Sequence, residues 1–125
     1  MDSTPIDFYQ DCIKTLLAEY EALNTDWASI ETLFDDQKKR YMVMRVGWNG
    51  QKRVHVCLVH IDIQDGMVVI QANNTEDELE DELVERGIPR ENICLGLLPP
   101  DVRASLRALR PQQQPVQHTY NTQQM

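Results

Sequence analysis

The stretch that decides the fold is Tyr41–Ala72, which reads YMVMRVGW-NG-QKRVHVCLVHIDIQ-DG-MVVIQA. Asn49-Gly50 and Asp65-Gly66 separate three runs that are rich in apolar and β-branched residues. Asn-Gly and Asp-Gly pairs tolerate the positive φ angles of a type I′ turn, and between apolar runs they are the strongest short-range signal for a β-hairpin. Two such turns in succession predict a three-stranded antiparallel meander.

If each turn is centred on its dipeptide, the register assigns every side chain of the meander to one face of the sheet. One face then carries the expected core beneath a helix: Met42, Met44, Val46, Trp48, Cys57, Val59, Ile61, Ile63, Val68 and Ile70. The other face carries five further apolar side chains: Tyr41, Val43, Val54, Val56 and Leu58. A sheet covered on one side only would not expose so many. We therefore expect this second face to be buried by another helix, by a partner protein or by a second copy of the chain in a dimer.

Ahead of the meander, the chain has the patterns of one helix and one strand. Thr4-Pro5 is a favourable helix start, and apolar residues then recur every three or four positions to about Ala22. This spacing predicts an N-terminal helix, which is the expected cover of the core face. Alternating apolar and polar residues over Trp27–Asp35 predict a half-buried strand.

Behind the meander, a strongly acidic helix is expected. Thr75 and Glu78 have the spacing of a capping box at its start, and Gly87 followed by Pro89 is typical of a helix end. The helix supplies a candidate interaction surface made of Glu76, Asp77, Glu80 and Asp81. Its carboxylates could imitate a phosphate backbone toward a DNA-handling partner, and a solvated helix face is the alternative explanation.

The C-terminal third adds shorter elements. The apolar run 93–98 is expected to form a fifth strand, and residues 99–109 a last helix that bears several arginines. Residues 111–125 are rich in Gln without any apolar period, which predicts a disordered tail. The chain is therefore predicted to be one α+β domain over residues 1–110. Its antiparallel meander of about four to five strands would pack against the N-terminal helix and the C-terminal helices.

The composition is that of a soluble protein with a single core: 125 residues, of which 42% are hydrophobic and 26% charged. A net charge of −8 repels DNA phosphates, so DNA binding by the protein surface as a whole is disfavoured. Cys12, Cys57 and Cys94 are odd in number and widely spaced, which indicates reduced thiols in a cytoplasmic protein. We expect no signal peptide, no membrane span and no cofactor.

Residues with catalytic potential are few. His60 and Asp62 lie on one side of a predicted strand and could orient a general base or hold a metal, but a polar network on the sheet surface is the favoured explanation. Arg45 would lie about 26 Å from Asp62 at the rise of a strand, too far to share a site within one molecule. His55 is expected to point into the core beside Met44. We therefore predict no catalytic residue and no metal ligand.

Several short motifs follow one another in an order that is typical of a known family. The most distinctive are Val-Gly-Trp-x-Gly at 46–50 and Leu-Gly-x-x-Pro-Pro-x-x-Arg at 95–103. Others are Phe34-Asp35, Tyr41, Arg53-Val54, His60-Ile61-Asp62-Ile63, Asp65-Gly66, Ile70-Gln71, Thr75-Glu76, Gly87-Ile88-Pro89 and Ile93. Over residues 6–105 the chain thereby resembles the XisI family, the fdxN element excision controlling factor proteins. Where that family commonly has Phe-His before the double proline, this chain has Leu97-Leu98, so any role of that His is absent.

The resemblance implies a protein that helps to control the programmed excision of a DNA element by a separate recombinase. It also implies an XisH-type partner that looks like a nuclease-fold protein, and it carries over no catalytic residue. We therefore expect a non-enzymatic regulatory protein that reaches DNA only through this partner. One alternative is an excisionase-like accessory factor that binds DNA directly through Lys38, Lys39, Arg40 and the C-terminal arginines. Another is a metal-dependent hydrolase centred on His60 and Asp62.

Overall fold

The computed structural model describes residues 5–96 and residue 101 of the chain. The elements in chain order are α1 (Pro5–Ala18), the 3₁₀ helix η1 (Glu19–Leu23), β1 (Ala28–Asp35), β2 (Arg40–Asn49), β3 (Lys52–Gln64), β4 (Met67–Asn73), α2 (Leu79–Glu85), the 3₁₀ helix η2 (Arg90–Asn92) and β5 (Ile93–Leu95). The predicted N-terminal helix and the strand after it are confirmed, with the helix tightening into η1 after Ala18. Apart from residue 101, the predicted last helix and the predicted tail lie outside the described residues.

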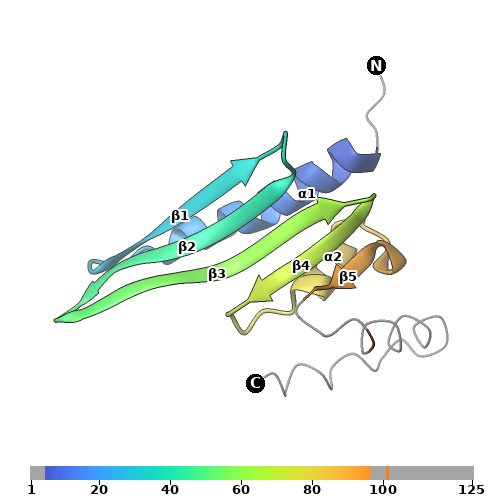
Figure 1. The fold of residues 1–125 in the computed structure, drawn as a ribbon. Coiled ribbons are helices and arrows are strands. Elements are labelled where there is room, and N and C mark those ends of the chain that lie inside the picture. The colour runs from blue at the N-terminus through green and yellow to red at the C-terminus, as the bar shows by residue number, and fades with distance from the viewer. Residues whose placement is uncertain (1–4, 97–100, 102–125) are drawn as a thin grey trace.

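The five strands form one sheet in the order β1-β2-β3-β4-β5 (Figure 1). Strands β1 to β4 are antiparallel neighbours in sequence, which confirms the predicted meander. Strand β5 instead lies parallel to β4, with Ile70 opposite Leu95. Parallel neighbours need a crossover connection, and here α2 and η2 lie on that connection. The structure thus has the predicted α+β class.

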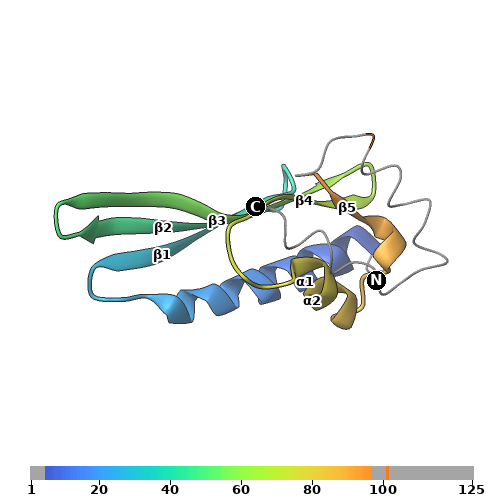
Figure 2. The same ribbon diagram turned by 90° about the horizontal axis from the view of Figure 1, so that it is seen from below.

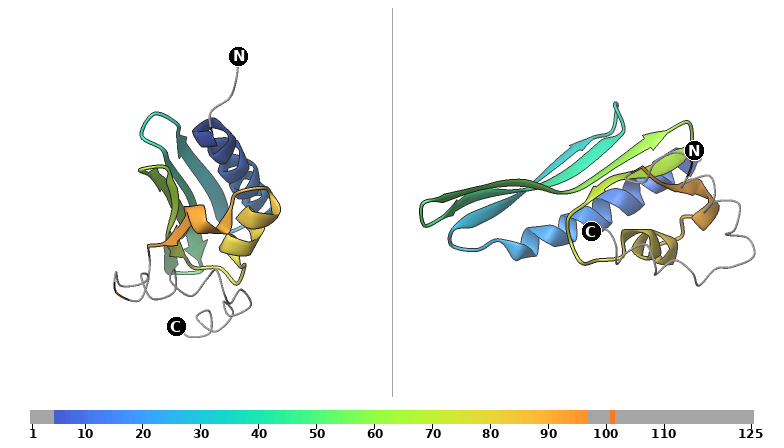
Figure 3. Two further views of the ribbon diagram at one scale, coloured as in Figure 1. Left: turned by 90° about the vertical axis from the view of Figure 1, so that its right-hand side faces the viewer. Right: turned by 60° about the horizontal axis from the view of Figure 1, so that its bottom comes forward.

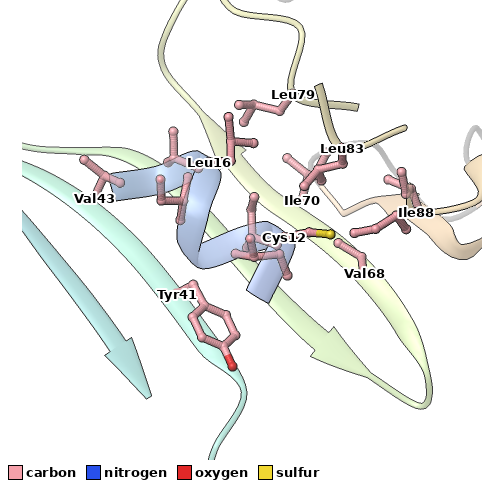
Figure 4. Close-up of a cluster of buried hydrophobic side chains, with 14 of the residues drawn as sticks. Cys12, Leu16, Tyr41, Val43, Val68, Ile70, Leu79, Leu83 and Ile88 are labelled. Carbon is pink, nitrogen blue, oxygen red and sulfur yellow. The ribbon is translucent and has the colours of Figure 1, made fainter. Parts of the chain in front are cut away.

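Both α-helices lie on the same side of the sheet, and no element of the described chain covers the opposite side (Figures 2 and 3). Helix α1 runs lengthwise beneath the strands, and α2 lies beside it. The core fills the space between these layers (Figure 4). From α1 it receives Tyr9, Cys12, Ile13, Leu16 and Leu17. Removing this apolar surface from water is the main force that holds the helices on the sheet.

A β-bulge in the middle of β3 decides which side chains face the helices. Val43 lies opposite Val59 and Met44 lies opposite Cys57, so Leu58 is an extra residue without a partner on β2. One extra residue reverses the side to which the rest of the strand points relative to its neighbour. Leu58 and Val59 consequently both belong to the core, at 7% and 0% exposure.

The predicted assignment of faces on β2 is wrong because of this bulge. Tyr41 and Val43 are fully buried and Leu58 nearly so, while Val56 packs against the margin of the same core. The proposed partner face of Tyr41, Val43, Val54, Val56 and Leu58 is therefore the helix-covered side of the sheet. The predicted core residues Met42, Met44, Val46, Trp48 and Cys57 lie on the other side. The residues beyond the bulge are buried as predicted: Val59, Ile61, Ile63, Val68 and Ile70.

The two hairpin turns differ from each other. Asp65 and Gly66 both have positive φ, at +52° and +78°, as the predicted type I′ turn requires. In the first hairpin Asn49 pairs with Lys52, so Gly50 and Gln51 are the central residues and only Gly50 has positive φ. This is the φ pattern of a type II′ turn, and it moves the partners along β3 relative to the predicted register. The centre of the turn moves by one residue, so residues 44–48 of β2 pair with β3 residues two positions farther along than predicted. The paired residues still share one face of the sheet, as in the predicted register.

Helix α2 begins later than its sequence pattern predicts. It starts at Leu79, and Glu78 makes no side-chain capping bond, so the predicted capping box is wrong. The Thr75 hydroxyl instead accepts the Asp77 backbone N–H at 3.1 Å and donates to Asn73 Oδ1 at 2.6 Å, which closes a local turn.

The end of α2 agrees with the prediction. Gly87 has a φ of +113°, its N–H donates to the Val84 carbonyl at 3.0 Å, and the Ile88 N–H donates to the Leu83 carbonyl at 3.1 Å. These two bonds make a Schellman motif, which satisfies carbonyls that the helix end leaves unpaired.

Candidate functional site

The side of the sheet opposite α1 exposes a stripe of apolar side chains along β1 and β2. Alternation along β2 places them there, because Tyr41 and Val43 point to the helices. We call this stripe the open face and define it as Leu33, Met42, Met44, Val46 and Trp48. Trp48 is 53% exposed and Leu33 52%, and the three residues between them are half-buried. Sequence reasoning assigned most of this stripe to the core because its residues are apolar.

Basic side chains border the open face on β3. The Arg53 guanidinium carbon lies 5.2 Å from the centre of the Trp48 ring, a cation–π arrangement that covers part of the indole. His55 lies opposite Val46 and is exposed, so the predicted interior position of His55 is wrong. Arg53 therefore places a positive charge at this border of an otherwise acidic chain.

The pair His60 and Asp62 lies farther along β3 on the same side of the sheet. His60 Nε2 and Asp62 Oδ1 are 2.7 Å apart, and the other carboxylate oxygen accepts hydrogen bonds from Gln71 Nε2 at 3.2 Å and Gln64 Nε2 at 3.5 Å. Asp62 is only 4% exposed. A buried carboxylate with three donors orients its neighbours and satisfies its own charge.

A metal or hydrolytic centre would need more groups than this pair. The described residues contain no cluster of three or more His, Cys, Asp or Glu side chains that could hold a metal ion. Arg45 does not join the pair, because it lies opposite Val56 on the covered side of the sheet. What the arrangement can do chemically is hold the imidazole of His60 in one orientation at the sheet surface.

The predicted acidic surface is divided between a loop and a buried ion pair. Glu76 and Asp77 are exposed in the loop before α2. Glu80 is 5% exposed and lies 3.3 Å from an Arg90 nitrogen, so its prediction as a surface residue is wrong. Arg90 also binds Asp81, at 3.1 Å. Of the four carboxylates in the predicted acidic surface, Glu80 and Asp81 therefore both form ion pairs with Arg90.

The loop before α2 is tied to the N-terminal helices. The Tyr20 hydroxyl donates to Asp77 Oδ2 at 2.6 Å. Burial first, and then this hydrogen bond, raises the pKa of Tyr20. Arg86 joins Glu82 and Glu19, at 3.0 Å and 2.7 Å. These contacts line a shallow cleft of about 270 Å³ between η1 and α2, whose walls are Leu16, Glu19, Tyr20, Leu23, Asp77 and Glu82.

Only some of the basic residues suggested for direct DNA binding lie in the part of the chain that the structure describes. Lys38 and Lys39 lie in the turn between β1 and β2, and Arg40 is the first residue of β2; Lys38 and Arg40 are exposed and Lys39 is half-buried. The Lys38 N–H donates to Asp35 Oδ1 at 2.9 Å, so a carboxylate lies within this basic corner. Arg103, Arg107 and Arg110 lie outside the described residues.

Comparison with known proteins identifies the family. The family model for the XisI protein matches residues 1–107. A crystal structure of a XisI-like protein from Anabaena variabilis is 35% identical, with a TM-score of 0.77, over 80% of this chain and 94% of that one. A structure of the fdxN element excision controlling factor XisI from the same organism is 28% identical, with a TM-score of 0.70, over 80% and 99%.

Among curated proteins, none matches this chain. Within the described residues, every helix is too short or too polar to cross a membrane. The match of the family model to most of the chain, together with the 35% identical structure, means that the chain belongs to the XisI family.

Proposed function

We propose that this protein is a non-enzymatic regulator of the programmed excision of a DNA element and that it acts by binding an XisH-type protein. Family membership and the likeness to a structure named as an fdxN element excision controlling factor support the role in excision. The observation that carries the mode of action is the open face. It keeps Trp48 and Leu33 more than half exposed on a sheet side without a helix over it in the described chain.

The composition of the open face suits a protein partner. Contiguous exposed apolar side chains on a soluble protein mark interaction sites. Met42 and Met44 are flexible and polarizable, so they adapt to the shape of a partner. Trp48 with Arg53 over its ring combines the two residue types that contribute most binding energy at interfaces.

Charge supports an indirect action on DNA. The chain carries a net charge of −8, so its overall field repels the phosphate backbone. A protein of this charge can instead bind a DNA-handling protein, whose surfaces are commonly basic. Exposed Glu76 and Asp77 lie in the loop before α2 and add to this field.

The polar pair on the open side is compatible with a non-catalytic role. Asp62 is buried and accepts hydrogen bonds from two glutamines in addition to its contact with His60. A carboxylate engaged in this way stabilises the strand ends at which it lies.

Co-expression with an XisH-type protein tests the proposal. Trp48→Glu combined with Met44→Glu places two charges on the open face, and Leu23→Glu is the matched control, because Leu23 is 48% exposed on η1, on the helix side. We expect the partner to co-purify with the wild type and the control and its affinity for the double variant to fall at least tenfold. Equal binding of all three proteins, or none by the wild type, would contradict the proposal.

A gel shift with DNA from the ends of an excised element tests the alternative of direct DNA binding. We expect no shift by the protein alone at low salt, where phosphate contacts are strongest. A salt-dependent shift that disappears in Lys38→Glu/Lys39→Glu would favour the excisionase-like alternative instead.

A further inference from the structure

Within the described residues, the first half of β3 has one unpaired edge, because β4 pairs only with the second half of β3. The β3–β4 ladder runs from Val59 to Gln64, whereas β3 begins at Lys52. The β2–β3 hairpin therefore projects beyond the end of β4 (Figure 1). Over residues 52–58, β3 pairs with β2 on one side, and no strand of the described chain pairs with its other side. We propose that a second copy of this chain adds its residues 52–56, antiparallel, to the same residues of this edge and forms a two-fold symmetric dimer.

At two other places the described chain caps an exposed strand edge. On the outer edge of β1, Asn24 Oδ1 accepts the Ile30 N–H at 2.6 Å. On β3 itself, Asn74 closes the edge next to the bulge, where its N–H donates to the Leu58 carbonyl at 2.7 Å and its side chain to the Cys57 carbonyl at 2.9 Å. Between residues 52 and 56 the described residues supply no comparable cap.

The open segment has the composition of a pairing strand. Val54 and Val56 are β-branched, and residues 52–57 contain neither Pro nor Gly. In an antiparallel ladder, every second residue directs its N–H and C=O away from its neighbour strand. Such a row of unpaired groups is a template for another strand, and folded proteins normally cover or interrupt it.

The shape of the edge is complementary to itself. Antiparallel pairing of the two copies about an axis normal to the sheet places residues 52–56 of each copy beside the same residues of the other, beyond the edge that Asn74 closes. The strand of one copy then continues the line of β4 of the other, and its Lys52 end meets the point where the chain leaves the sheet after Asn73. Both α1 helices remain on one side, so the two open faces join into one continuous surface.

Charge at the two ends of this contact is also complementary. The tip of the hairpin carries Lys52 and Arg53, both exposed. The loop that follows β4 carries Glu76, Asp77 and Glu78, also exposed. In the dimer each basic tip lies against the acidic loop of the other copy, and symmetry produces this contact twice. A lysine on an edge strand normally discourages the pairing of that strand with another chain. Here the lysine of one copy approaches a negatively charged loop of the other copy, so the charges attract.

Charge reversal provides the test, because all substituted side chains are exposed. The first variant carries Lys52→Glu and Arg53→Glu, and the second carries Glu76→Lys and Glu78→Lys. Light scattering across a concentration series should give twice the chain mass for the wild type. Each variant alone should give the monomer mass, with the dissociation constant raised at least tenfold. An equimolar mixture should form dimers again, because both contacts then join opposite charges.

Several results would overturn the proposed dimer. These are a wild type that stays monomeric at high concentration, a variant that dimerises as well as the wild type, and a mixture that fails to recover the dimer. Hydrogen exchange of the wild type provides a readout that is independent of the variants. Backbone amides in 53–57 should gain protection with rising protein concentration, and concentration-independent exchange there would also refute the proposal. Neither measurement uses an XisH-type protein, so their outcome is separate from that of the proposed function.

Discussion

Gly47 packs directly against the backbone of Trp27, so closely that a Cβ atom at position 47 would overlap the Trp27 carbonyl oxygen and lie 2.7 Å from the Ala28 Cα. That same carbonyl accepts the Trp48 N–H at 3.0 Å. The close approach anchors the start of β1 on β2, and it explains why glycine stands between Val46 and Trp48.

Replacing Gly47 with Ala should therefore destabilise the fold. Backbone atoms must move to accept the methyl group, and overpacking of this kind costs about 1–3 kcal/mol of the free energy of unfolding. Urea denaturation measures the change. Gly66→Asn is the control, because nothing lies within 4 Å of a Cβ there and Asn tolerates the left-handed φ of +78°. A Gly47→Ala protein as stable as the control would contradict the close packing.

The bulge at Leu58 leads to a prediction about two adjacent residues of β2. Val43 is fully buried against Val59, whereas Met44 lies on the open face. Val43→Thr keeps the shape but buries a hydroxyl, which costs about 1–3 kcal/mol without a hydrogen-bond partner. Met44→Thr places a β-branched residue on an accessible strand face and should change stability by less than about 0.5 kcal/mol. Equal effects in thermal or urea unfolding would mean that the faces are assigned wrongly.

Local signals sufficed to predict the strands, but not which way β2 faces. Turn dipeptides and alternation act over a few residues, and they located the meander and the Schellman end at Gly87. The bulge at Leu58 leaves no mark in the sequence, since Leu58 and Val59 are both apolar and either could face the core. This one unpaired residue places Val43 in the core and Met44 on the open face, which is the reverse of the predicted assignment.

The candidate site was predictable only in part, for a related reason. The sequence predicts core positions for the apolar residues of β2, because exposing a large side chain such as Trp48 to water is unfavourable. The predicted surface position of Glu80 is wrong, because its buried ion pair with Arg90 joins residues ten apart that no short pattern connects. The free edge of β3 depends on where β4 stops pairing, and that follows from the path of the chain after Asn73.

The polar pair on β3 should behave as a structural network. Asp62→Ala leaves three donors, from His60, Gln64 and Gln71, without their acceptor and should cost about 1–3 kcal/mol of unfolding free energy. His60→Ala should cost less, about 0.5–1.5 kcal/mol, because the His60 side chain is 27% exposed and water can replace its contact with Asp62. Co-purification with an XisH-type protein should survive His60→Ala. Loss of the partner without loss of stability would give His60 a direct role in binding.

Two tyrosines should make the fold sensitive to alkali. Burial first, and then hydrogen bonds to Asp77 and Asp36 respectively, raises the pKa of Tyr20 and of Tyr41. A raised pKa in the folded state favours the neutral phenol. The stability from both groups is therefore complete below the ordinary tyrosine pKa of about 10 and is lost as the pH rises above it.

Tyrosinate absorbance and circular dichroism, followed together from pH 8 upward, check this sensitivity. In the wild type, Tyr20 and Tyr41 should ionise only as the secondary structure is lost. Tyr20→Phe and Tyr41→Phe should each remove the signal of one tyrosinate from that late phase, because each removes a buried phenol that is bound to a carboxylate. Ionisation of either group well before unfolding would show that its burial and its carboxylate partner do not hold the proton in place.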